Sequence, residues 1–170
     1  MRTAAPRPST TPASSGPATA SSTRPSAFRP PCPSGPDTGG GDAQVTGTAG
    51  PVTLSTGGGN LSADHVSGPL HLHTDGGDIQ AAGITSATVT ADSGGGDIQI
   101  VFTSVPRDVE VHTSGGDVTL VLPPGLTQYR VTAHTDGGDI SDTVPQSTSA
   151  ADVITATSGG GNTTIRQPQP

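Results

Sequence analysis

A short glycine motif that closes with Asp or Asn recurs seven times along this chain of 170 residues. The closing residues are Asp42, Asn60, Asp78, Asp97, Asp117, Asp139 and Asn162, at intervals of 18, 18, 19, 20, 22 and 23 residues. Periods this short and nearly regular indicate a solenoid, in which one supersecondary unit stacks repeatedly on its neighbours. They are too short for the blades of a propeller.

Apolar and polar residues alternate on both sides of each glycine motif. Val52 and Leu54 stand eight and six residues before Asn60, with Thr53 between them, and the later repeats place apolar residues at the same two positions. Another apolar residue, such as Ile98, follows the closing residue directly in most copies. Because alternation with period two is typical of half-buried strands, each repeat predicts two strands joined by a glycine corner.

A single-stranded parallel β-solenoid, similar to a β-helix, satisfies this pattern. We expect an all-β domain over residues 37–166 with coils of 18 to 23 residues, each paired with the coils above and below it. Residues 1–36 form a predicted disordered tail rich in Pro, Ser, Thr and Arg, and residues 167–170 a second, short tail. An antiparallel meander with glycine hairpins is the competing architecture.

The corner glycines have a predicted structural role. A sharp corner needs either a positive φ or a close approach between backbones, and glycine supplies both, while Asp or Asn can close the corner by hydrogen bonding to nearby amides. The residues assigned to this role are Gly58, Gly59, Asn60, Gly76, Gly77, Asp78, Gly95, Gly96, Asp97, Gly115, Gly116, Asp117, Gly137, Gly138, Asp139, Gly160, Gly161 and Asn162.

Composition restricts the function classes that remain. Apolar residues make up 29% of the chain and aromatic residues total three, so we expect no bulky globular core. From residue 37 onward, 14 acidic residues face only three arginines and no lysine. That charge disfavours nucleic acid as a partner. The single cysteine, Cys32, excludes a disulfide framework within the chain.

Targeting signals are not apparent in the sequence. It contains no apolar run of the length that a membrane span or a secretory signal needs. Two alternatives remain open: the arginine-rich start reflects a misassigned start site, or the chain is a truncated fragment of a cell-envelope protein. Either would make the cell envelope or the cell exterior the expected location.

The repeats resemble a bacterial β-strand repeat family that is filed as a domain of unknown function and often labelled adhesin-like. The closest segments are VEVHTSGGDVTLVLPPG (109–125) and YRVTAHTDGGDI (129–140), and the resemblance extends over about residues 38 to 166. It implies the solenoid fold, but it carries no catalytic residue. The family usually has an extracytoplasmic anchor before the coils, which the start of this chain does not resemble.

Two metal-binding interpretations can be weighed against structural ones. The corner aspartates suggest a calcium β-roll, but that motif needs a nine-residue period, so we expect turn closure instead. A column five residues before each closing residue contains His73, Asp92 and His112, and His71 lies two residues from His73 on the same strand face. These four side chains are metal-competent, although a solvated row of His and Asp is the expected arrangement.

The remaining candidates lie in the segments that return from one coil to the next. Phe102, Arg107, Tyr129 and Arg130 bring aromatic and cationic side chains to loops on a regular scaffold, which is where repeat proteins commonly bind. The alternative for Phe102 is that it folds inward. The sequence contains no recognisable catalytic or cofactor motif. We therefore predict a structural or interaction module that is not an enzyme and uses no cofactor, with an unknown protein or cell-surface partner and an undefined oligomeric state; a metal- or small-ligand-binding module is the alternative.

Overall fold

The computed structural model describes residues 37–168, and all the regular elements among them are strands. The strands are β1 (Asp37–Thr38), β2 (Ala43–Thr46), β3 (Val52–Thr56), β4 (Leu61–Asp64), β5 (Leu70–Thr74), β6 (Ile79–Ile84), β7 (Thr88–Ser93), β8 (Ile98–Phe102), β9 (Asp108–Thr113), β10 (Val118–Val121), β11 (Arg130–Thr135), β12 (Ile140–Asp142), β13 (Val153–Ser158) and β14 (Thr163–Arg166). The predictions for residues 1–36 and for Cys32 lie outside the described residues.

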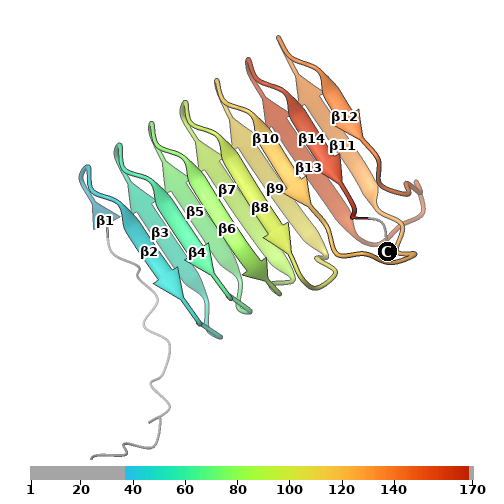
Figure 1. The fold of residues 1–170 in the computed structure, drawn as a ribbon, viewed down its shortest axis with the longest axis horizontal. Coiled ribbons are helices and arrows are strands. Elements are labelled where there is room, and N and C mark those ends of the chain that lie inside the picture. Colours follow the sequence, from blue (N-terminus) through green and yellow to red (C-terminus); the bar gives the residue numbers. More distant parts are fainter. Residues whose placement is uncertain (1–36, 169–170) are drawn as a thin grey trace, which may run out of the picture. The chain divides into compact units, whose positions relative to one another are not determined.

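The strands form two seven-stranded sheets that lie face to face (Figure 1). Odd-numbered strands make one sheet and even-numbered strands the other, so each glycine corner carries the chain from the first sheet to the second. We call two consecutive strands and the corner between them a coil. Every strand pairing is parallel, which confirms the β-solenoid and excludes the antiparallel meander.

The core lies between the two sheets and consists of the predicted apolar columns. Val52, Leu70, Val89 and Val109 are buried at the position eight residues before the corner, and Leu61, Ile79, Ile98 and Val118 directly after it. Their strand neighbours point outward, and the register pairs each column residue with its equivalent in the next coil. The period-two pattern thus sets which face of each strand is buried.

The coils do not stack in chain order at the C-terminal end. β13 lies between β9 and β11, and β14 lies between β10 and β12. In Figure 1 the dark red last coil is therefore seen between the amber β10 and the orange β12. After β10 the chain forms β11 and β12 one coil position further along the stack. The last two strands, β13 and β14, then occupy the position between that coil and the coil of β9 and β10. The nearly regular spacing of the motifs, which rises steadily from 18 to 23 residues, gave no indication of this coil order.

Asp142 supplies a physical reason for this coil order. Three residues after each closing residue the interior coils place a buried apolar side chain, such as Ile100, Leu120 or Ile165, whereas β12 has Asp142. A carboxylate inside the stack would lose its hydration without a paired charge. At the end of the stack Asp142 stays partly exposed, with Oδ1 accepting the amide hydrogen of Val144 at 2.9 Å and Oδ2 accepting a hydrogen bond from Gln146.

Candidate functional site

Close stacking explains why glycine occupies the position before the closing residue in six of the seven corners. A Cβ built on Gly96 would overlap the backbone carbonyl of Gly77, and one on Gly116 would overlap that of Gly96. The same clash arises at Gly59, Gly77, Gly138 and Gly161. Among the described residues, positive φ angles occur only at Gly47, His65 and Gly83, outside the corners. Of the two predicted reasons for these glycines, close backbone approach is the one that the structure supports.

The closing Asp and Asn side chains join successive coils. Oδ1 of Asp78 accepts the amide hydrogen of Asp97 at 2.9 Å, and Oδ1 of Asp97 accepts that of Asp117 at 2.8 Å. The series runs without interruption, following the spatial order of the coils, through Asp42, Asn60, Asp78, Asp97, Asp117, Asn162 and Asp139. The hydrogen bonds to nearby amides that the sequence predicted are therefore present, and the amides belong to the corner of the adjacent coil.

A second row of hydrogen bonds lies just inside the corner. The hydroxyl of Thr74 donates to the carbonyl of Gly59 in the adjacent coil at 3.0 Å and accepts the amide hydrogen of Gly77 in its own corner at 3.1 Å. Thr56, Ser93, Thr113, Thr135 and Ser158 make the equivalent pair of bonds. These hydroxyls satisfy backbone groups that strand pairing leaves without a partner, so the corner is fixed from two sides.

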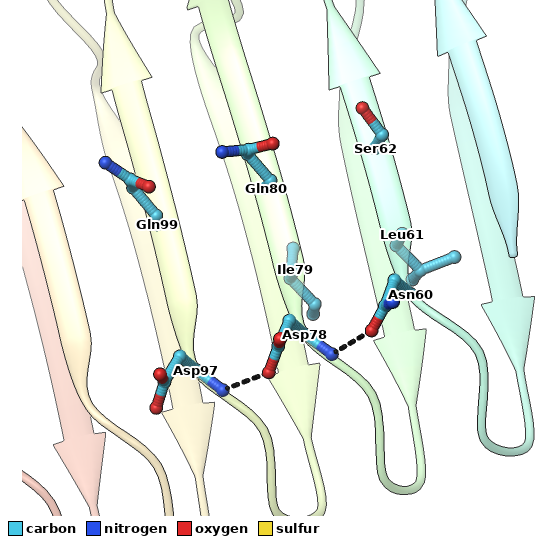
Figure 2. A pocket seen from close by; sticks show the side chains of 8 residues that line it. All are labelled: Asn60, Leu61, Ser62, Asp78, Ile79, Gln80, Asp97 and Gln99. Atoms are coloured by element: carbon cyan, nitrogen blue, oxygen red, sulfur yellow. Dashed lines mark hydrogen bonds between the residues drawn. The ribbon is translucent and has the colours of Figure 1, made fainter.

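A shallow groove of about 340 Å³ crosses the corner ends of β4, β6 and β8 (Figure 2). Two rows of polar side chains line it, together with Leu61 and Ile79: Asn60, Asp78 and Asp97 in one row and Ser62, Gln80 and Gln99 in the other. The second row is in register across the sheet, since Ser62 pairs with Gln80 and Gln80 with Gln99. The groove is thus a regular grid of amide, hydroxyl and carboxylate groups on a fixed backbone.

The parallel register places the residues of the His and Asp column on neighbouring strands, as the repeat predicted. His73 lies opposite Asp92, and Asp92 opposite His112, on the exposed face of the sheet that contains β5, β7 and β9. His71 is also exposed on β5, beside Thr90. Nε2 of His73 lies 3.4 Å from Oδ1 of Asp75. Nevertheless, no three His, Cys, Asp or Glu side chains within residues 37–168 are grouped closely enough to hold a metal ion.

The return-segment candidates divide into exposed and buried residues. Arg107 and Arg130 are exposed, and Nη2 of Arg130 donates to the carbonyl of Thr148 at 3.0 Å. Phe102 is buried in the core, which is the inward alternative. Tyr129 is also fully buried, so the exposed aromatic contact that the interaction hypothesis gave it is not available. Tyr129 lies directly before β11 and pairs in parallel with Gln146, and the inward alternation of β11 extends back to it, which places its side chain inside.

Tyr129 borders a small cavity of about 130 Å³ at the end of the stack, together with Arg130, Val131 and the segment 146–148. Its hydroxyl has no hydrogen-bond partner among the described residues. Burial raises the pKa of the Tyr129 phenol, and the nearby carboxylate of Asp152 raises it further. The charged form of this side chain is therefore disfavoured in the folded protein.

Comparison with known proteins gives one match. Residues 35–167 match the family model described as Toastrack DUF4097. No curated protein matches the chain, and neither does any solved structure. Across the described part of the chain, no helix has the length and apolar character to cross a membrane.

Proposed function

The chain belongs to the Toastrack DUF4097 family, a family of unknown function, and on that premise we propose that its solenoid is a non-catalytic, adhesin-like interaction module for a protein or cell-surface partner. The observation that carries the proposal is the polar groove over β4, β6 and β8. Its side chains project from a backbone that two rows of inter-coil hydrogen bonds hold in place. A surface ordered before binding loses little conformational entropy when a partner docks.

The chemistry of the groove limits the partner. Asp78 and Asp97 are exposed carboxylates, while Gln80 and Gln99 offer both amide donors and carbonyl acceptors. Adjacent members of each row are about 4.8 Å apart, the spacing of paired strands. An extended partner that is neutral or cationic and rich in hydrogen-bond donors fits this grid, whereas a polyanion is repelled.

The openness of the groove to water supports a binding role over a catalytic one. Oδ1 of Asp78 and Oδ1 of Asp97 each accept a backbone amide hydrogen, so both oxygens are engaged in holding the fold. Exposed carboxylates that already accept hydrogen bonds from the adjacent coil are better suited to recognition than to proton transfer.

Site-specific photocrosslinking in the cells that make the protein tests the proposal. A photoreactive residue replaces Gln80 or Gln99 in the groove, with Thr53 on the opposite sheet as the control. We expect a discrete crosslinked partner from the groove positions and none from Thr53, which is exposed on β3. Crosslinks at Thr53 alone, or at neither surface, would contradict the assignment of the groove.

The register of His73, Asp92 and His112 keeps a second candidate function in view, because adjacent strands place these metal-competent side chains side by side. Titration calorimetry with zinc distinguishes this metal-binding module from the interaction module. We expect no stoichiometric binding. Binding that His73→Ala and His112→Ala abolish would support the metal-binding candidate instead.

A further inference from the structure

The two ends of the coil stack are complementary to each other. The described part of the stack ends in β1 and β2 on one side and in β11 and β12 on the other. We propose that these ends dock head to tail, with β11 and β12 of one copy pairing in parallel with β1 and β2 of a second copy of this chain. This interface is distinct from the groove, and the proposal does not depend on the groove having a partner.

Hydrogen-bonding groups at the ends repeat the pattern inside the stack. At each interior boundary the amide following the closing residue donates to the closing residue's carbonyl in the adjacent coil, as Val118 does to Asn162 at 2.8 Å and Thr163 to Asp139 at 2.9 Å. Ile140 follows the closing residue Asp139 in the edge strand β12, so its amide points away from the stack, toward where a next coil would lie. At the opposite end of the stack, the carbonyl of the closing residue Asp42 would be the acceptor for such an amide.

The closing side chains extend the same complementarity. Oδ1 of Asn162 accepts the amide hydrogen of Asp139 at 3.0 Å, and β12 is the last strand of its sheet, so Oδ1 of Asp139 is the next acceptor in the series. The first corner offers the amide of Asp42, whose own Oδ1 already accepts the amide hydrogen of Asn60 at 2.8 Å. A second copy set against β12 would therefore continue the row with a bond from Asp42 to Asp139.

Gly41 supplies an independent observation. The other glycines directly before a closing residue are required because a Cβ would overlap the adjacent coil. A Cβ on Gly41 would have no described atom within 4 Å, and the φ of Gly41 is not positive. Within residues 39–168 of one copy, the space around this position would therefore admit a side chain. Against the carbonyl of Gly138 in a second copy, a glycine would be needed for the same reason as at Gly96.

The apolar columns also end uncovered at β11 and β12. Ile140 is 47% exposed, whereas Ile98 in the same column is 1% exposed. Val131 and Ala133 are only half buried, although they continue columns that are buried in the interior coils. A coil from a second copy would cover all three side chains, in the way that each interior coil covers its neighbour.

Asp142 limits how tightly the ends associate. Its carboxylate stands in a core column at the last strand, and an inward-pointing charge on an edge is a known restraint on edge pairing. Docking would bring this charge toward Val45 of the second copy, which stands in the same column. We therefore infer a reversible, concentration-dependent contact. Because a head-to-tail contact does not close on itself, it produces a series of oligomers and no single dimer.

Analytical ultracentrifugation of the full 170-residue chain tests the inference over about 1 µM to about 1 mM, a range that covers weak association. We expect the average mass to rise above the 16.6 kDa of one chain without a plateau at the dimer. Gly41→Val should abolish the rise and leave the thermal midpoint unchanged. Gly40→Val is the matched control, since a Cβ there also meets open space, and it should associate like the original chain.

Neutralising the edge charge provides the opposite perturbation. Asp142→Asn keeps an acceptor for the amide of Val144 and should shift association to several-fold lower concentration. A monomer at every concentration, for both the original chain and Asp142→Asn, would overturn the proposal. So would association that Gly41→Val leaves unchanged, because it would place the contact elsewhere. Photocrosslinking from Gln80 in the Gly41→Val variant shows separately whether the groove retains its partner.

Discussion

The coil made by β7 and β8 and the coil made by β11 and β12 carry the same motif but differ in how completely they are covered. Ala91 and Ile98 in the interior coil are 0% and 1% exposed. Ala133 and Ile140, their equivalents in the end coil, are half buried and 47% exposed. The motif thus specifies the path of the chain through a coil, whereas the core around that coil depends on having neighbours on both sides.

Placing a charge at the apolar position directly after the closing residue should give the largest difference in stability loss between an interior coil and the end coil. Ile98→Asp places an unpaired carboxylate in the core and should cost about 4 kcal/mol or more of unfolding free energy. Ile140→Asp, at the exposed equivalent position, should cost less than about 1 kcal/mol. Chemical denaturation of the two variants measures both values. Equal losses would mean that the end coil is covered as fully as the interior.

Glycine substitution separates stacking from turn geometry. Gly96→Ala forces a methyl group against the carbonyl of Gly77 and should cost about 3 kcal/mol, in the range of overpacked sites. Gly95→Ala, one residue earlier, and Gly41→Ala, in the first corner, meet open space and should change stability by less than about 1 kcal/mol. Thermal melts of the three variants provide the comparison. A large loss at Gly95 would show that the corner itself demands glycine.

Removing a closing carboxylate should have a smaller effect that again depends on position. Asp97→Ala deletes the acceptor for the amide of Asp117 and should cost about 1 kcal/mol, whereas Asp139→Ala at the end coil should cost close to nothing. Asp97→Asn keeps the acceptor and removes repulsion from Asp78 and Asp117, so it should be neutral or slightly stabilising. Urea titrations resolve these differences. Destabilisation by Asp97→Asn would show that the negative charge is itself required.

Substitution of Tyr129 should have the smallest effect on stability at neutral pH and a separate effect on stability at alkaline pH. Its raised pKa means that the neutral phenol is favoured by folding, so stability is fully present below the ordinary phenol pKa of about 10 and falls as the pH rises above it. Tyr129→Phe removes the unpartnered hydroxyl and should match or exceed the original chain in thermal stability at pH 7. The midpoint of alkaline unfolding should also lie at a higher pH for Tyr129→Phe than for the original chain. An unchanged alkaline midpoint would show that Tyr129 does not contribute to alkaline unfolding.

The sequence predicted the local features of this fold well because they are encoded one coil at a time. Alternation around each corner identified the buried residues, as at Val89 and Ile98, and parallel stacking followed from the period. Coil order was missed because β11 and β13 carry nearly the same pattern. The one local signal was Asp142 in a position that is apolar in its neighbours.

The candidate sites were harder to predict, because their exposure depends on tertiary context. Tyr129 belongs to a segment rich in loop residues, yet it continues the inward face of β11 and is buried. The groove was not predicted because its lining residues, such as Gln80 and Gln99, are unremarkable singly and form a grid only when strands pair.

Disulfide trapping tests the coil order most directly. With Cys32→Ser as the background, one variant carries cysteines at His112 and Thr157, which are register partners on adjacent strands, and the other at His112 and His134, which are separated by β13. Adjacent strands lie about 4.8 Å apart, within disulfide reach, and strands two apart lie at about twice that distance, beyond it. We predict rapid, quantitative oxidation of the His112 and Thr157 pair and none within a monomer for the His112 and His134 pair. The reverse result would show that the coils stack in chain order and would contradict this account.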